Sequence, residues 1–93
     1  MNYEKNEQVS SIYKKEISLT DIQTNALSLF SKNGFSLSTQ AFEAFAKSHG
    51  VFKNSLIESI NDACFEIIDD VLIEEEEENF HLNEPYYKQI LAT

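Results

Sequence analysis

The chain of 93 residues has no arginine and no tryptophan, a single cysteine, a single proline and two glycines. The scarcity of glycine argues against a glycine-rich phosphate-binding loop, and the scarcity of turn-forming residues argues against most small all-β folds. One cysteine cannot form an internal disulfide, and the chain lacks the Cys and His spacings that are typical of zinc sites. These absences leave a small domain that depends on its apolar core.

Long apolar runs are also absent. No segment approaches the ~18 apolar residues of a membrane-spanning helix, and the N-terminal residues 1–11 lack the apolar stretch of a secretory signal. Apolar residues make up 42% of the chain and charged residues 25%, values that are ordinary for a globular domain. We therefore expect a cytoplasmic protein without a membrane span.

Positive charge is scarce and unevenly distributed. Residues 1–53 hold six lysines and five acidic residues, a net charge of +1, whereas residues 54–93 hold eleven acidic residues and one lysine, a net charge of −10. Nucleic-acid binding normally needs a basic face that neutralises phosphates, so we expect no direct contact with nucleic acid. An acidic half favours a protein partner with a basic surface, a divalent cation or imitation of nucleic acid, and it equally suits a surface that only aids solubility.

Capping residues and apolar spacing predict three helices. Thr20 and Gln23 have the spacing of a capping box, and the helix that follows ends at Gly34. Ser38 is the expected N-cap of a second helix. A third helix over about 54–69 has an amphipathic period, and its apolar stripe is formed by Leu56, Ile60, Ala63, Cys64 and Ile67.

After the third helix the pattern changes to that of strands. The β-branched run Val71–Ile73 and the alternating segment Phe80–Leu82 predict a hairpin within about residues 71–84, with its turn at Glu77–Asn79. Pro85 suits the first turn of a final helix, where its missing N–H is not needed.

The expected fold class is mainly α with a small β-hairpin (α+β). The outline is winged-helix-like, with three to four helices, a two-stranded hairpin and a closing C-terminal helix. We expect residues 1–18 to form an N-terminal arm or short helix, and residues 19–93 to form a single acidic helical domain.

Two acidic segments dominate the C-terminal half. At about 100° per residue, the carboxylates of the third helix share one side, where like charges four residues apart destabilise a helix by roughly 0.2–0.5 kcal/mol each. This side is either a solvated face, a docking strip for a basic partner or a platform for a hard cation such as calcium. Five glutamates follow in the hairpin, where charge prevents pairing with other sheets; the run lacks the alternating Asp or Asn and the glycine of a calcium loop. The predicted interaction residues are Glu58, Asp62, Glu66, Asp69, Glu75, Glu76, Glu77, Glu78 and Phe65.

Three further residues of the third helix carry separate expectations. Phe65 lies beside the acidic residues, so either the hairpin covers it or it is an exposed anchor for a partner. Asn61 lies between the apolar and acidic sides, where its amide can bind the hairpin backbone. Cys64 lies on the apolar stripe and no motif links it to a histidine, so we expect a buried, unreactive thiol and no enzymatic activity.

Three segments of the C-terminal half form a pattern that a known family shares. They are Ser59–Ala63 in a helix, Asp70–Glu74 at the entry to a strand, and Phe80–Glu84 followed by Tyr86 and Tyr87. Together they resemble the TerB-C domain, the C-terminal module of proteins that are associated with bacterial tellurite resistance and stress response. Where that family usually has a glycine, this chain has Asp69, a residue type that tolerates a left-handed turn.

The resemblance implies a non-catalytic module whose partners include other domains of a larger parent protein. It also implies a site for a divalent cation, calcium or magnesium, at Asp62, Asp70 and Glu74. Two functions follow as hypotheses. The first is an acidic protein-interaction module of a bacterial stress-response or defence system, with a weak cation site, and the alternative is an acidic inhibitor that mimics nucleic acid and blocks a DNA- or RNA-binding enzyme.

Overall fold

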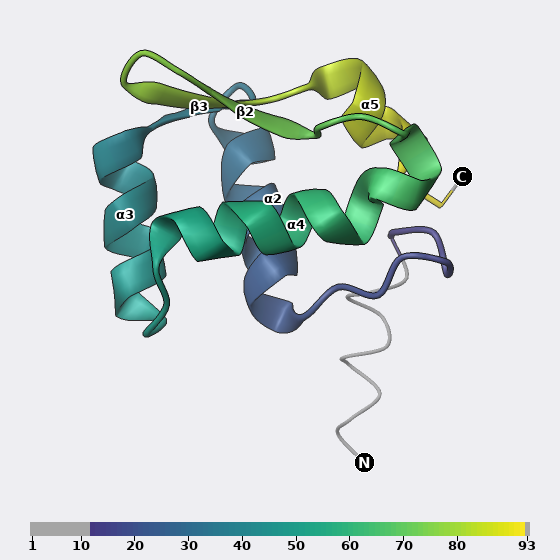
Figure 1. Cartoon of the computed structure of the whole chain (residues 1–93), viewed down its shortest axis with the longest axis horizontal. Helices are drawn as coiled ribbons and strands as arrows, with labels where there is room; N and C mark the ends of the chain where they lie inside the picture. Colours follow the sequence, from purple (N-terminus) through teal and green to yellow (C-terminus); the bar gives the residue numbers. More distant parts are fainter. Residues whose placement is uncertain (1–11, 93) are drawn as a thin grey trace.

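A computed structural model describes residues 12–92 of the chain (Figure 1). The described part is mainly helical with a small antiparallel sheet, so the predicted fold class is confirmed. Its helices are all too short or too polar to cross a membrane. The elements, in chain order, are α2 (Asp21–Lys32), β1 (Ser36–Ser38), α3 (Thr39–Ser48), α4 (Lys53–Ile68), β2 (Ile73–Glu76), β3 (Asn79–Leu82) and α5 (Glu84–Gln89).

Side-chain caps begin α2 and α3, as the sequence predicts, and Asn83 caps α5. At α2 the Gln23 backbone N–H donates to the Thr20 hydroxyl at 3.2 Å, and the Thr20 N–H donates to the Gln23 side chain at 2.8 Å. Ser38 accepts from the Ala41 N–H at 3.0 Å at the start of α3. Such bonds satisfy N–H groups that have no partner within the helix, which fixes where each helix starts.

The predicted hairpin consists of β2 and β3, and β1 adds a third strand that the sequence analysis did not predict. The strand order is β1-β3-β2, with Leu37 opposite Phe80 on one side and Glu75 opposite Phe80 on the other. β1 has only three residues, too few to display the alternation of a strand, and Ser38 signals a helix cap. The order of helices and strands from α2 to β3 is that of a winged helix.

The hairpin turn is shorter than predicted, because Asn79 already belongs to β3. Two residues, Glu77 and Glu78, connect the strands, and Glu77 has a left-handed φ of 59°. Glycine or asparagine is the usual choice for such a φ, so this turn holds a glutamate in a strained conformation.

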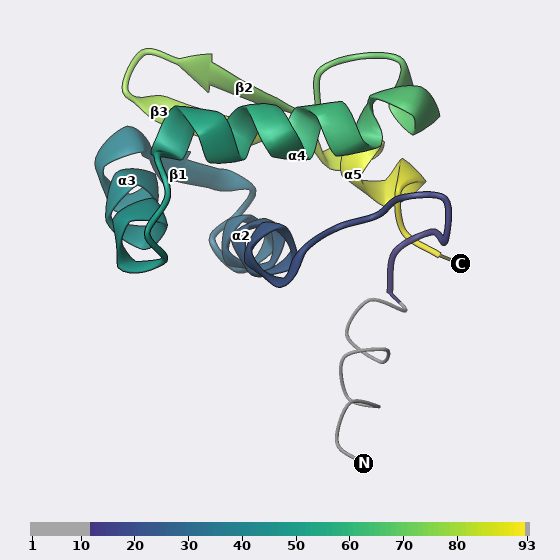
Figure 2. The same cartoon turned by 60° about the horizontal axis from the view of Figure 1, so that its bottom comes forward.

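The core lies between the sheet and the helices α2, α3 and α4 (Figures 1 and 2). Phe42 is at its centre, with ring centroids 5.5 Å from Phe30 of α2 and 5.4 Å from Phe80 of β3. These three aromatic rings are almost inaccessible to solvent. Burying each ring removes a large apolar area from water, which makes this contact between helices and sheet the main stabilising element of the fold.

The buried side of α4 is turned slightly from the predicted stripe. Ile57 and Ile68, which the stripe places at its margin, are buried, whereas Ala63 and Ile67 are half-buried. The hairpin and α5 both contact α4. We attribute this rotation of the buried side to the contacts of α4 with the hairpin and α5, which the helical period alone does not reveal.

The segment before α2 joins the core through the end of the chain. Tyr13 pairs with Leu91 in an isolated antiparallel bridge, the Lys14 N–H donates to the Ile90 carbonyl at 2.9 Å, and the Tyr13 and Tyr87 hydroxyls lie 3.3 Å apart. Within residues 12–20 the chain forms no helix. The part of the predicted arm or helix that falls on residues 1–11 lies outside the described residues.

Asn61 fastens α4 to the hairpin, as expected from its position on the helix. Its side-chain Nδ2 donates to the Ile73 carbonyl at 3.1 Å, and its Oδ1 accepts from the Ile73 N–H at 2.9 Å. One amide therefore satisfies both backbone groups of a buried β2 residue.

We expect Asn61→Ala to lower the free energy of unfolding by about 2 kcal/mol, because two partly buried hydrogen bonds are lost and Ile73 keeps two unpaired polar groups. Urea denaturation of the full chain measures the change. The control is Asn25→Ala in α2, an exposed asparagine. Equal stability of the two variants would contradict a structural role for Asn61.

Candidate functional site

The outer side of α4 carries a row of carboxylates. Glu58, Asp62, Glu66 and Asp69 are all exposed, on the side of the helix away from Ile60 and Cys64. The helical period of about 3.6 residues gathers them there. Asp69 also ends the helix: it has a left-handed φ of 56°, and its N–H donates to the Phe65 carbonyl at 2.7 Å. Glycine is the residue that adopts this conformation with least strain.

All five glutamates of the hairpin are exposed as well, from Glu74 to Glu78. In a strand, neighbouring side chains point to opposite faces of the sheet. Glu74 and Glu76 therefore share the face that His81 occupies, and the Glu76 carboxylate lies 3.7 Å from the His81 ring. Glu75 points to the opposite face, on the side of Ile73.

The Asn61–Ile73 hydrogen bonds bring the helical row and the glutamate run together. They join α4 to β2, so the two segments, separate in sequence, form one acidic surface. No lysine occurs between residues 54 and 87. In the described part of the chain, the lysine ion pairs involve Glu43 and Glu84, both outside this surface. We define the acidic surface as Glu58, Asp62, Glu66, Asp69, Glu74, Glu75, Glu76, Glu77 and Glu78.

Phe65 is exposed beside this surface. About half of its side chain, 49%, is accessible to solvent, and Val71 nearby in sequence is 41% exposed. The alternative in which the hairpin covers Phe65 is therefore wrong. The reason is the direction of β2, which leaves its junction with Asn61 toward the N-terminal end of α4 and away from Phe65 (Figure 1).

The three residues expected to bind a cation do not form a ligand group. Within residues 12–92, no three His, Cys, Asp or Glu side chains lie close enough to hold a metal ion. The Asp70 carboxylate has other partners: Oδ1 accepts from the Val71 N–H at 2.7 Å, and Oδ2 accepts from the Tyr86 hydroxyl at 2.8 Å. These two hydrogen bonds, the backbone one first, lower the pKa of Asp70 and favour the charged carboxylate. Asp70 thus ties the end of α4 to α5.

Cys64 lies in the interior of the fold, as predicted. Its side chain is inaccessible to solvent, and burial raises the pKa of the thiol to about 11. A thiol of this kind stays protonated at neutral pH and is a poor nucleophile.

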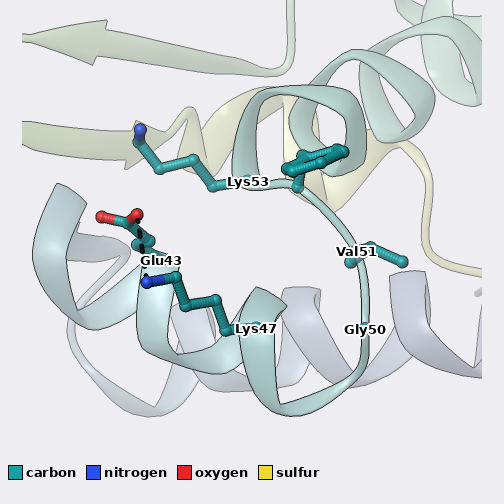
Figure 3. A pocket seen from close by; sticks show the side chains of 6 residues that line it. Glu43, Lys47, Gly50, Val51 and Lys53 are labelled. Atoms are coloured by element: carbon teal, nitrogen blue, oxygen red, sulfur yellow. Dashed lines mark ion pairs between the residues drawn. The ribbon is translucent and has the colours of Figure 1, made fainter.

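Two hollows, whose walls include no residue of the acidic surface, were not expected from the sequence. One, of about 220 Å³, lies at the corner between α3 and α4, where the Glu43 carboxylate sits between the side chains of Lys47 and Lys53 (Figure 3). Phe52 in its wall is 81% exposed. The other, of about 520 Å³, is a shallow groove between α2 and α4 that includes Ile22 and Leu56. Both depend on contacts between helices, which no local pattern predicts.

The fold and the surface together define a small winged-helix-like α+β domain with one strongly acidic side. The model of the TerB-C domain family matches residues 2–91, so the chain belongs to this family, a tellurite-resistance-associated module. No curated protein and no solved structure was found to match the chain.

Because the acidic surface lacks a ligand group, we expect calcium and magnesium to act only by screening. Thermal melts in millimolar calcium chloride, magnesium chloride and sodium chloride of equal ionic strength should give the same rise in Tm. A specific ion at a hundred times its Kd would add ~2.7 kcal/mol to the stability. A rise of several degrees in calcium alone would therefore contradict this expectation.

Alkaline pH should destabilise the domain through Cys64. Its pKa is raised from 9.0 to about 11, so the unfolded chain loses the thiol proton at lower pH than the folded chain. The stability that this thiol contributes is complete below pH 9 and falls as the pH rises toward 11. Denaturation at several pH values should show a shallower fall in Cys64→Ala than in the parent chain. An identical pH dependence in the two proteins would show that the thiol is accessible in the folded state.

Proposed function

We propose that this domain is a non-catalytic interaction module of a bacterial stress-response or defence system, and that it binds basic protein surfaces through its acidic surface. The observation that carries the proposal is the joining of two carboxylate rows, on α4 and β2, that form no lysine ion pair within residues 12–92, next to the exposed ring of Phe65. A single-sign surface of this kind attracts oppositely charged partners and speeds their association.

Phe65 gives the surface an apolar contact point. Aromatic side chains supply much of the binding energy at protein interfaces, where a polar rim surrounds them. Val71 is similarly exposed. A partner that offers lysine or arginine around an apolar side chain fits this arrangement. The proposed partner is a second protein or another domain of a larger parent chain.

Imitation of nucleic acid is the second candidate function. Carboxylates four residues apart on α4, such as Glu58, Asp62 and Glu66, repeat at about 6 Å along the helix axis, which is close to the spacing of phosphates along a strand. In this case the partner is a DNA- or RNA-binding enzyme, and the domain blocks its nucleic-acid site.

Charge reversal tests both candidates. We expect the triple variant Glu58→Lys, Asp62→Lys and Glu66→Lys to lose partner binding while it remains folded, with little change in stability, because three lysines at four-residue spacing repel each other much as the carboxylates did. The matched control reverses Glu16, Asp21 and Glu43, which changes the net charge equally outside the acidic surface. Affinity capture from bacterial lysate at low and high salt, with a thermal melt of each variant, measures both effects.

The proteins retained by the parent chain and the control, but not by the triple variant, decide between the candidates. A partner that DNA or RNA displaces from the domain supports imitation of nucleic acid. A basic partner that nucleic acid does not displace supports the interaction module. Equal retention by all three proteins would overturn both.

A further inference from the structure

The outer edge of β2 has backbone groups that the sheet does not use. β2 is an edge strand, since the strand order is β1-β3-β2. In an antiparallel pair, alternate residues direct their N–H and C=O groups toward the partner strand and away from it. Both groups of Ile73 bind Asn61 rather than β3, so Ile73 belongs to the outward set. Glu75, two residues further, belongs to the same set and directs its N–H and C=O to the free edge.

Asn61 shows how this edge binds a peptide group. Its side-chain amide donates to the carbonyl and accepts from the N–H of the same residue, Ile73, which is what the backbone of a neighbouring strand does. Asn61 of α4 thus occupies the place opposite Ile73 that the first residue of an added strand would take. The next position, opposite Glu75, has no such side chain in the described residues.

The charges around the edge select the occupant. Glu74 and Glu76 point to one face of the sheet and Glu75 points to the other, and all three are exposed. A second copy paired through the same edge would place glutamates opposite glutamates, which is destabilising, whereas lysine or arginine on both faces of an added strand would meet carboxylates. The edge therefore disfavours pairing with a second copy of this chain and favours a basic strand.

We propose that an extended basic segment of a partner protein adds to the free edge of β2 as a fourth strand. The Glu75 N–H and C=O bind its backbone, and the three glutamates bind lysine or arginine side chains on its two faces. Strand addition of this type obtains affinity from backbone hydrogen bonds and specificity from side chains. The inference rests on the proposed function and names the form in which the partner is bound.

Amide hydrogen exchange of the full chain, followed by NMR, tests the inference directly. The probe is a short peptide in which lysine alternates with threonine, and the control ligand is spermine, a polycation without peptide groups. We expect the Glu75 N–H to exchange fast in the free protein, while the N–H groups of Glu74 and Glu76 exchange slowly. Saturating peptide should slow exchange at Glu75 by about tenfold or more, and spermine should leave it unchanged.

A pair of variants separates the backbone bond from the charge. Glu75→Pro and Glu75→Gln both remove the carboxylate, but only Glu75→Pro removes the N–H, and proline is tolerated in an edge strand where that N–H faces solvent. We expect the peptide Kd of Glu75→Pro to be about tenfold weaker than that of Glu75→Gln, and the spermine Kd to be equal. A thermal melt checks that both variants fold, and the exchange measurement on the parent chain stands without them.

Each outcome bears on the inference. Protection of Glu75 by the peptide alone supports it. Peptide binding with unchanged exchange at Glu75 overturns strand addition and leaves the proposed acidic interaction module intact. Absence of peptide binding at low salt overturns the inference together with the proposed preference for basic partners.

Discussion

The two hydrogen bonds between Asn61 and Ile73 are the constraint on which the acidic side of this domain depends. They fix β2 against α4 at one point and so determine which side of the helix the hairpin covers and which side it leaves open. The rows of carboxylates on α4 and β2 become neighbours through this junction. Phe65, one turn beyond Asn61, stays exposed for the same reason. Apolar packing around Phe42 holds the fold together, but it does not set this detail of the surface.

A surface whose charges all have the same sign destabilises the fold that carries it. On α4, successive carboxylates at four-residue spacing repel each other by a few tenths of a kcal/mol per pair. In the hairpin, Glu77 adopts a left-handed φ that glycine or asparagine would adopt with less strain. Neither feature improves packing. A neutral or mixed surface at these positions would be more stable.

The structural features that are predicted correctly from the sequence depend on local interactions. The capping box at Thr20 and Gln23, the cap at Ser38 and the burial of Cys64 all depend on residues within a few positions of one another or on one helical period. The predicted fold class follows from these signals. The hydrogen bonding of Asn61 to the hairpin could also be predicted from the sequence. An asparagine at the margin of an apolar stripe has few reasons to be there other than a hydrogen bond.

Long-range contacts explain what the sequence analysis missed. β1 is a strand only because β3 lies beside it, and the exposure of Phe65 depends on the direction in which β2 leaves α4. For the three proposed metal ligands, the sequence pattern indicates acidic residues but not their distances, and Asp70 is occupied by Val71 and Tyr86. Information of this kind comes from the packing of elements that are far apart in the chain.

The bridge between Tyr13 and Leu91 has a mechanical consequence. The segments on either side of it run antiparallel, with the Ala92 N–H bonded to the Ile12 carbonyl at 2.9 Å and the Lys14 N–H bonded to the Ile90 carbonyl at 2.9 Å. Tension applied at residues 12 and 92 loads these bonds one after another, as in a zipper, rather than all at once in shear. A pull across the two ends therefore separates the segment before α2 from the segment after α5 first, at low force, before any load reaches the core of the fold.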